Sequence, residues 1–142
     1  AAPLRRLWLA NPPWGSGFYE TISSEPEIRT YLSNCFHNPR RIGPDLVRRL
    51  VDNARRPGSM RAHASLVTGY LDWNLLDPLP RVINPILLIW GRHARPAPVE
   101  HSVRLNAMAR DCRLEVVEDA GAWVHHEQSA IVNRLLESFL SS

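Results

Sequence analysis

The stretch PILLIWGRHA, residues 85–94, decides how this chain folds. It holds a run of leucine-rich and β-branched apolar residues, Ile86–Trp90, which ends at Gly91. A short apolar run bounded by turn residues is typical of a strand buried on both faces. The stretch EDAGAWVHHE, residues 118–127, follows a second apolar strand candidate in the same way. Reactive groups project from the carboxyl ends of parallel strands, so both stretches stand where chemistry is expected.

Strand and helix patterns alternate through the C-terminal part of the chain. The second strand candidate, Arg113–Val117, lies between a helix that begins near Pro98 and a closing helix over Glu127–Leu140. Such alternation predicts an α/β fold in which helices cover a parallel sheet. The closing helix is expected to bury Ile131, Val132, Leu135, Leu136, Phe139 and Leu140.

The N-terminal part predicts a strand followed by a helical region. Leu4–Ala10 is the strand candidate, and the prolines and glycines of Asn11–Gly15 predict a loop after it. Ser24 is expected to cap the first of three helices, with Pro26 in its first turn. The helices are expected over residues 24–36, 44–56 and 60–71.

Composition fits a single globular domain. The chain has 142 residues, of which 44% are hydrophobic and 22% charged. Its longest apolar run is far shorter than a bilayer requires, and the start shows no secretory signal pattern. The two cysteines, Cys35 and Cys112, are not spaced as in a disulfide scaffold or a zinc site. We therefore expect a soluble cytoplasmic protein with no membrane partner.

All seventeen basic residues are arginines, and the formal net charge is +3. Several of these arginines lie in the helix expected over residues 44–56, whose other face is apolar. Ordinary solvation of a polar helix face accounts for them, so we do not expect a nucleic-acid partner. Binding of another anion through this face stays open as a weaker hypothesis; the residues concerned are Arg48, Arg49, Arg55 and Arg56.

Taken in order, the motifs resemble the C-terminal half of an α/β-hydrolase-fold protein. They are NPILLIWGR at residues 84–92, Pro98–Glu100, Leu114–Val117, the Gly-x-Trp-x-His-x-Glu pattern within residues 120–128, and Val132–Leu140. The resemblance implies an α/β fold: a parallel sheet segment with a helical lid inserted after its first strand. It divides the chain into a core strand and loop (1–14), a helical lid and return (15–80) and a C-terminal core (81–142).

The same resemblance implies where catalytic groups belong. Such enzymes place an acid after the seventh strand and a histidine after the glycine that follows the eighth. By position the acid belongs at Ala94 and the histidine at Ala122. The nucleophile elbow, typically Gly-x-Ser-x-Gly, does not occur in the sequence. We therefore expect no catalytic competence in this chain alone and no cofactor.

Neighbouring histidines are poor substitutes for the missing groups. His93 adjoins Ala94, while His125 and His126 lie about one helical turn, or roughly 5 Å, beyond Ala122. A general base must reach its nucleophile to about 3 Å, so geometry disfavours these substitutes, and packing or capping is the expected role of His125. Among the six histidines only His125 and His126 are close in sequence, and we expect no metal site.

Aromatic side chains in or beside the expected lid are candidates to line an apolar pocket for a small ligand. They are Trp14, Phe18, Tyr19, Tyr70 and Trp73, joined by Trp123 from the second strand-end loop.

Strands cut from a parallel sheet leave unpaired backbone groups at their edges. We therefore expect a partner that completes the sheet: the N-terminal half of the same fold, as a separate chain or a cleaved segment. A strand-swapped homodimer is the alternative. Function then divides into half of an ester or acyl hydrolase, a non-catalytic relative that binds a ligand in the lid pocket, and, more weakly, an anion-binding module.

Overall fold

The computed structural model describes residues 12–62 and 76–141, without the side chains of residues 12–16. The chain divides into two compact units. The first unit comprises residues 1–31 and 43–73, and the second comprises residues 32–42 and 74–142. The described elements are α2 (Pro12–Ile22), α3 (Glu25–Cys35), η1 (Pro39–Arg41), α4 (Pro44–Ala54), η2 (Leu79–Arg81), β1 (Ile86–Gly91), α6 (Val99–Met108), β2 (Cys112–Val117), α7 (Val124–Glu127) and α8 (Ser129–Leu140).

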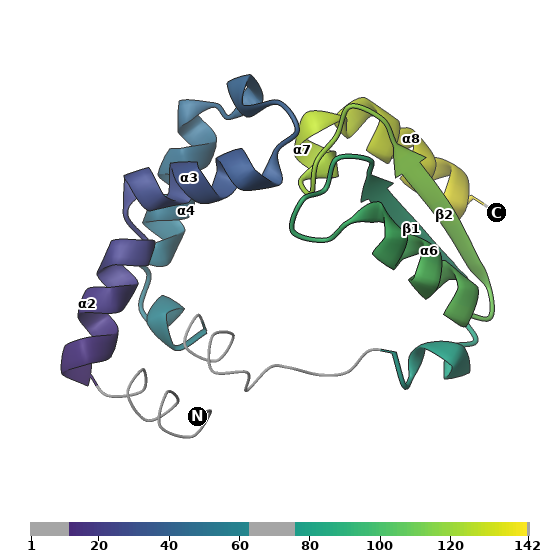
Figure 1. The fold of residues 1–142 in the computed structure, drawn as a ribbon, viewed down its shortest axis with the longest axis horizontal. Helices are drawn as coiled ribbons and strands as arrows, with labels where there is room; N and C mark the ends of the chain where they lie inside the picture. Colours follow the sequence, from purple (N-terminus) through teal and green to yellow (C-terminus); the bar gives the residue numbers. More distant parts are fainter. Residues whose placement is uncertain (1–11, 63–75, 142) are drawn as a thin grey trace. The chain divides into compact units, whose positions relative to one another are not determined.

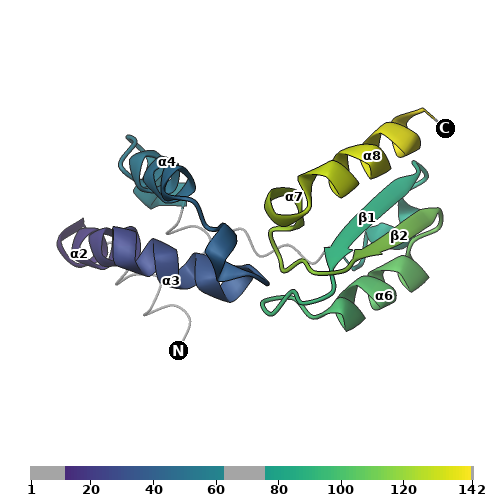
Figure 2. The same ribbon diagram turned by 90° about the horizontal axis from the view of Figure 1, so that it is seen from above.

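The second unit is built on the parallel pair β1 and β2. Ile86 is paired with Cys112 and Gly91 with Val117, so the two strands end side by side. Helix α6 joins them as a crossover and lies on one side of the pair, while α8 lies on the other (Figures 1 and 2). This arrangement confirms the predicted α/β class with a parallel sheet segment.

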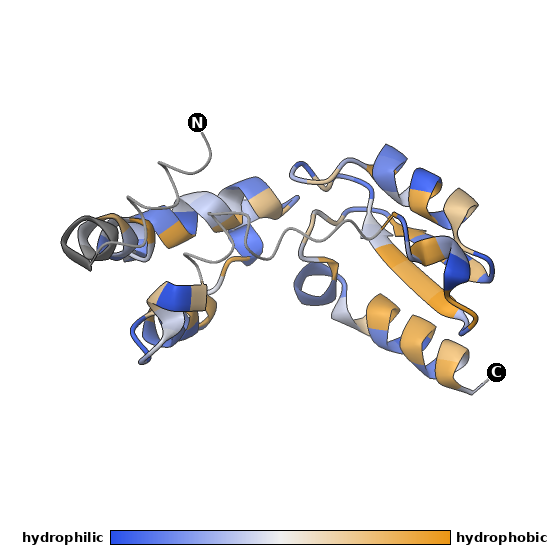
Figure 3. Cartoon of the chain, turned by 90° about the horizontal axis from the view of Figure 1, so that it is seen from below, coloured by the Kyte–Doolittle hydropathy of each residue, from blue (hydrophilic) through white to orange (hydrophobic). Residues whose placement is uncertain are grey.

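The core of the second unit lies between the strands and α8. Its buried members are Val117, Ala120, Val124 and Val132, and Ile89, Ile131 and Leu135 pack against them. In Figure 3 the apolar colour is concentrated along β1 and on one side of α8. The sequence analysis was wrong to bury Leu136 and Leu140, which are 42% and 81% exposed. The two described strands cover only one face of α8, and Leu136 and Leu140 lie outside that face.

Strand β1 is less buried than its sequence predicts. Ile86–Trp90 are all half-buried, and only Gly91 at the end of the strand is buried. Within the described residues β1 is paired only along the edge that faces β2. The prediction of a strand buried on both faces is therefore not met by the described residues alone.

The first unit confirms two predicted helices and corrects a third element. Helices α3 and α4 match their predicted ranges closely, and α4 buries Leu46, Val47 and Val51 while its arginines are exposed. The predicted loop Asn11–Gly15 is wrong, because α2 begins at Pro12. Proline is tolerated in the first turn of a helix, where its missing N–H has no intrahelical partner to lose.

Two further predictions extend beyond the described residues. Residues 59–62 are helical, in agreement with the start of the third predicted helix, whose remainder lies outside the described part. The strand expected over Leu4–Ala10 lies outside it too. No helix in residues 12–62 or 76–141 is long and apolar enough to cross a lipid bilayer.

The predicted closing helix is two helices. Glu127 ends the short α7, and α8 begins at Ser129. Gln128 separates them because its backbone, with φ −133° and ψ 47°, lies outside the helical region. His125 and His126 thus belong to α7 and not to the first turn of α8.

Gly121 lies where the second strand-end loop touches the end of α3. A Cβ atom at this position would stand 2.7 Å from the backbone nitrogen of His37 and would overlap the carbonyl oxygen of Cys35. We expect Gly121→Ala to destabilise the protein by about 2–3 kcal/mol, because backbone atoms cannot move aside cheaply. Urea unfolding measures the change. Gly43→Ala is the matched control, since open space surrounds that position; equal stability of the two variants would contradict the close approach.

Candidate functional site

The loops that follow β1 and β2 lie against each other at the carboxyl end of the sheet. The N–H of Arg92 donates to the carbonyl of Val117 at 3.0 Å, and the N–H of His93 donates to that of Ala120 at 2.9 Å. Asp119 bends the second loop with φ 53°, a left-handed conformation that aspartate tolerates better than most residues. The parallel register therefore brings His93 and Asp119 to one place.

The end of α3 is the third segment at this edge, and one buried carboxylate holds it there. Glu127 is only 4% exposed. One oxygen accepts the N–H groups of Gly121 at 2.7 Å and His37 at 3.0 Å, and the other accepts that of Asn38 at 2.9 Å. The guanidinium of Arg41 also donates to the backbone carbonyl of Glu127. Backbone donors thus satisfy a buried charge that would otherwise be costly.

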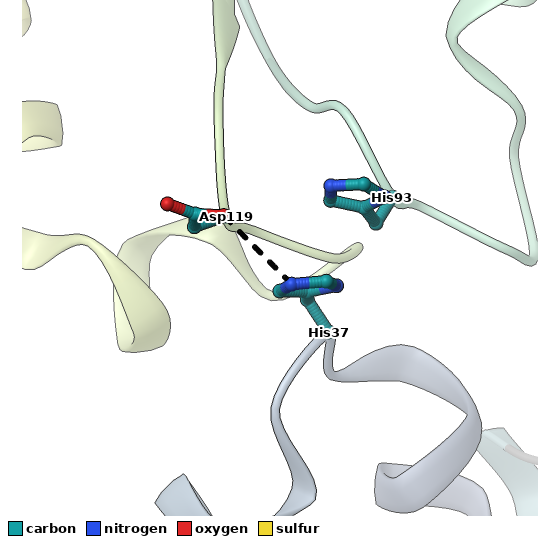
Figure 4. Close-up of side chains that lie close together, drawn as sticks. All are labelled: His37, His93 and Asp119. Atoms are coloured by element: carbon teal, nitrogen blue, oxygen red, sulfur yellow. Dashed lines mark ion pairs between the residues drawn. The ribbon is translucent and has the colours of Figure 1, made fainter.

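A cluster of three side chains results, one from each segment: His37, His93 and Asp119 (Figure 4). The two imidazole rings stack with centroids 4.0 Å apart and 18° between their planes. Nε2 of His37 lies 3.9 Å from a carboxylate oxygen of Asp119. The sequence analysis considered only closeness along the chain, where His125 and His126 are neighbours, and so did not bring His37 and His93 together. His37 and His93 are far apart in the chain, and only the fold joins them.

The cluster borders a hollow that opens to solvent. The hollow has a volume of about 330 Å³ and is lined by His37, Asn38, Arg41, Asp119 and Gln128. Its lining is polar, with both an acidic and a basic side chain. The sequence analysis did not single out His37, Arg41 or Glu127 as site residues. Of these three residues only Glu127 is part of a sequence motif, as the last member of the Gly-x-Trp-x-His-x-Glu pattern.

The comparisons with known proteins point in one direction. No protein-family model matches the sequence. A 2-hydroxy-6-oxononadienedioate/2-hydroxy-6-oxononatrienedioate hydrolase of Paraburkholderia xenovorans is 30% identical over 136 residues, covering 92% of this chain and 47% of the relative. A hydrolase of the same name from Cupriavidus pinatubonensis is 26% identical, covering 96% and 49%.

Solved structures agree on the fold. The meta-cleavage product hydrolase CumD of Pseudomonas fluorescens superposes with a TM-score of 0.71 at 22% identity, covering 97% of this chain and 49% of that one. The serine hydrolase CarC, involved in carbazole degradation, superposes with a TM-score of 0.74 at 15% identity, covering 84% and 48%. The chain spans about half the length of the relatives it matches.

The chain corresponds to the C-terminal half of the α/β-hydrolase fold. The resemblance stated from the motifs is confirmed at this level. The three-part division at residues 14 and 80 stays a prediction.

In this hydrolase half both alanines of interest lie in the loops that follow the core strands. Ala94 is buried, at 6% exposure, and its N–H donates to the carbonyl of Gly91 at 3.2 Å. Ala122 is exposed, and its N–H donates to the carbonyl of Cys35 at 2.7 Å. Both therefore have defined backbone positions, and neither presents a reactive side chain. Their assignment as acid and base positions remains a prediction.

The other predicted site residues belong to the two units or lie outside the described residues. Trp123 is half-buried, and its ring lies 5.1–5.9 Å, between centroids, from Phe36, His125 and His126. In the first unit Phe18 is exposed, while the hydroxyl of Tyr19 donates to the carbonyl of Ala54 at 2.7 Å. Tyr70, Trp73 and the side chain of Trp14 lie outside the described residues.

An exposed ion pair fastens the two strand-end loops of this hydrolase half. The guanidinium of Arg92 donates to the carboxylate of Glu118 through Nε at 3.0 Å and Nη2 at 2.7 Å. These hydrogen bonds lower the pKa of Glu118 and raise that of Arg92. The contribution of the pair is present above the ordinary carboxyl pKa and is lost as pH falls through the lowered one.

Replacing the buried anchor tests its role. Glu127→Ala leaves three backbone N–H groups without their acceptor, so we expect a loss of roughly 3 kcal/mol in urea unfolding. Hydrogen exchange should accelerate most at the amides of His37, Asn38 and Gly121.

Glu137→Ala, an exposed position on α8, is the control and should change stability by less than about 0.5 kcal/mol. Unchanged exchange at the three amides in Glu127→Ala would show that the anchor is dispensable.

Proposed function

We propose that this chain is the lid-bearing C-terminal half of an α/β-hydrolase-family protein that cannot catalyse hydrolysis as this chain alone. The observation that carries the proposal is the pair of alanines, Ala94 and Ala122, in the loops that follow β1 and β2. In a hydrolase of this fold these loops would supply the acid and the histidine. A methyl group can neither hold nor move a proton, so the expected route fails at two of its three groups.

The nearby histidines do not repair this route in the described geometry. His93 stacks on His37, and His125 stacks on Trp123 with centroids 5.7 Å apart. His126 lies against Phe36 and Trp123. These contacts support packing roles for His125 and His126, as the sequence analysis expected for His125.

The names of the relatives suggest the ancestral substrate class. We propose descent from enzymes that hydrolyse 2-hydroxy-6-oxodienoate compounds, which places the ancestral reaction at an acyl carbonyl group. We also propose a cytoplasmic location, since Cys35 and Cys112 are both free thiols.

An N-terminal half of the same fold is the proposed partner. Support comes from β1, whose apolar residues Ile86–Trp90 are only half-buried in the described structure, and from Ile83, which is 75% exposed. A further strand beside β1 would cover this apolar surface and pair the edge of β1 that no strand of the described residues occupies.

Non-catalytic ligand binding is a second candidate function. In the first unit a hollow of about 500 Å³ is lined by Tyr19 and Met60 together with polar and charged residues, among them Glu20, Glu25, Arg55 and Arg56. The arginine face of α4 gives less support to anion binding. Arg48 pairs with Asp45 at 3.5 Å, so an acidic group offsets part of the charge of this face.

Restoring both side chains tests the loss of catalysis. We expect the chain, assembled with the N-terminal half of the Paraburkholderia relative, to turn over neither a 2-hydroxy-6-oxodienoate nor a p-nitrophenyl ester. Ala94→Asp combined with Ala122→His should raise turnover at least about 100-fold, while either change alone should give little, because triad members act as a unit. Stopped-flow absorbance measures the rates. Hydrolysis by the unrestored assembly that a serine-directed phosphonate abolishes would refute the proposal.

The partner is tested on the native material by size-exclusion chromatography and mass spectrometry. We expect the 16.2 kDa chain to elute with an N-terminal segment of the same fold. A homodimer would point instead to strand exchange. A stable, monodisperse monomer of 16.2 kDa would contradict both forms of the partner proposal.

A further inference from the structure

Three metal-binding side chains converge at the carboxyl end of the sheet although the proposed hydrolase chemistry uses none of them. His37 follows α3, His93 follows β1 and Asp119 follows β2 (Figure 4). One donor atom from each residue can be chosen so that all three lie within 4.8 Å of one another. Two imidazoles and a carboxylate are ligands that zinc and its neighbouring divalent transition metals accept.

We propose that His37, His93 and Asp119 form a binding site for a divalent transition-metal ion of the zinc class, with water completing its shell. Bonds of about 2.0–2.1 Å around a tetrahedral ion put neighbouring donor atoms roughly 3.3 Å apart. Nε2 of His37 and the carboxylate of Asp119, now 3.9 Å apart, need to close by less than 1 Å.

The side chains have the freedom for this closure. The side chain of Asp119 is 79% exposed and His93 is exposed, so these two side chains can rotate, while that of His37 is half-buried at 35% exposure. The imidazole rings lie nearly parallel, at 18°. Lone pairs in two stacked planes do not meet at one point, so one ring must turn out of the stack when the ion binds. Binding therefore breaks the His37–His93 stack.

The backbone beneath the cluster is already fixed. The N–H of His37 is held by Glu127, and that of His93 by the carbonyl of Ala120. Asp119 directly follows Glu118, whose carboxylate is tied to Arg92. Ion binding thus orders side chains only, which limits its entropic cost.

The surrounding charges allow a cation. Asp119 contributes one negative charge that no arginine of the described residues neutralises in an ion pair, and Glu118 is already matched by Arg92. Arg41 lines the same hollow, but it donates to the backbone carbonyl of Glu127. This guanidinium is therefore already engaged with a neighbouring carbonyl.

Isothermal titration calorimetry of the chain with zinc chloride near neutral pH tests the site. We expect one ion per chain. His37→Ala, His93→Ala and Asp119→Asn should each weaken binding at least about 10-fold, since even groups that only orient a ligand contribute 10- to 100-fold. Asparagine keeps the size of Asp119 and tolerates its left-handed backbone.

His101→Ala on α6 and His125→Ala on α7 are matched controls, because both histidines are exposed and lie outside the cluster. They should leave zinc affinity unchanged. Binding that survives all three cluster variants, or that disappears in the controls, would overturn the proposal, as would no binding at millimolar zinc.

Two measurements separate ligand loss from misfolding. Zinc should raise the thermal midpoint of the unmodified chain but not that of a folded Asp119→Asn variant. In NMR spectra zinc should shift the ring protons of His37 and His93 together and leave those of His101 in place. Equal thermal shifts in both proteins, or shifts at His101 alone, would contradict the assignment.

Discussion

The buried carboxylate of Glu127 is the interaction on which the rest of the second unit depends. It accepts backbone N–H groups from the loop after β2 and from the segment after α3, so it fixes two pieces of chain that are far apart in sequence. A carboxylate suits this position because it offers two acceptor oxygens and no donor. Placing its charge among three backbone donors replaces the solvation lost on burial.

The hydrogen bonds of Glu127 lie at the edge of the sheet where both strands end. Parallel pairing of β1 with β2 puts both carboxyl ends together, and reactive groups gather at such edges in α/β proteins. Here the expected acid and base positions hold Ala94 and Ala122, whereas His37, His93 and Asp119 meet a few residues away. The structure thus brings potential ligand side chains together at this edge, although not at the two expected positions.

Several helices and strands could be predicted from the sequence because the pattern of neighbouring apolar and polar residues determines them. The apolar run Ile86–Trp90 became β1, and the period of apolar residues in α4 gave its buried face correctly. The errors also have local causes. Two prolines suggested a loop where they occupy the first turn of α2, and the backbone of Gln128 interrupts what looked like one closing helix. Leu136 and Leu140 are exposed because burial depends on what covers a helix.

The sequence by itself determined the α/β class, the strand–helix–strand order of β1, α6 and β2, the resemblance to half of a hydrolase fold and the alanines at positions 94 and 122. These follow from periodicity and from ordered motifs, which are properties of neighbouring residues. Only the tertiary structure decided that the ring of His37 stacks on that of His93 and that Asp119 lies beside them. It also decided that Glu127 is buried and accepts hydrogen bonds from backbone N–H groups. Such contacts join residues far apart in the chain, and no spacing in the sequence encodes the distance between them.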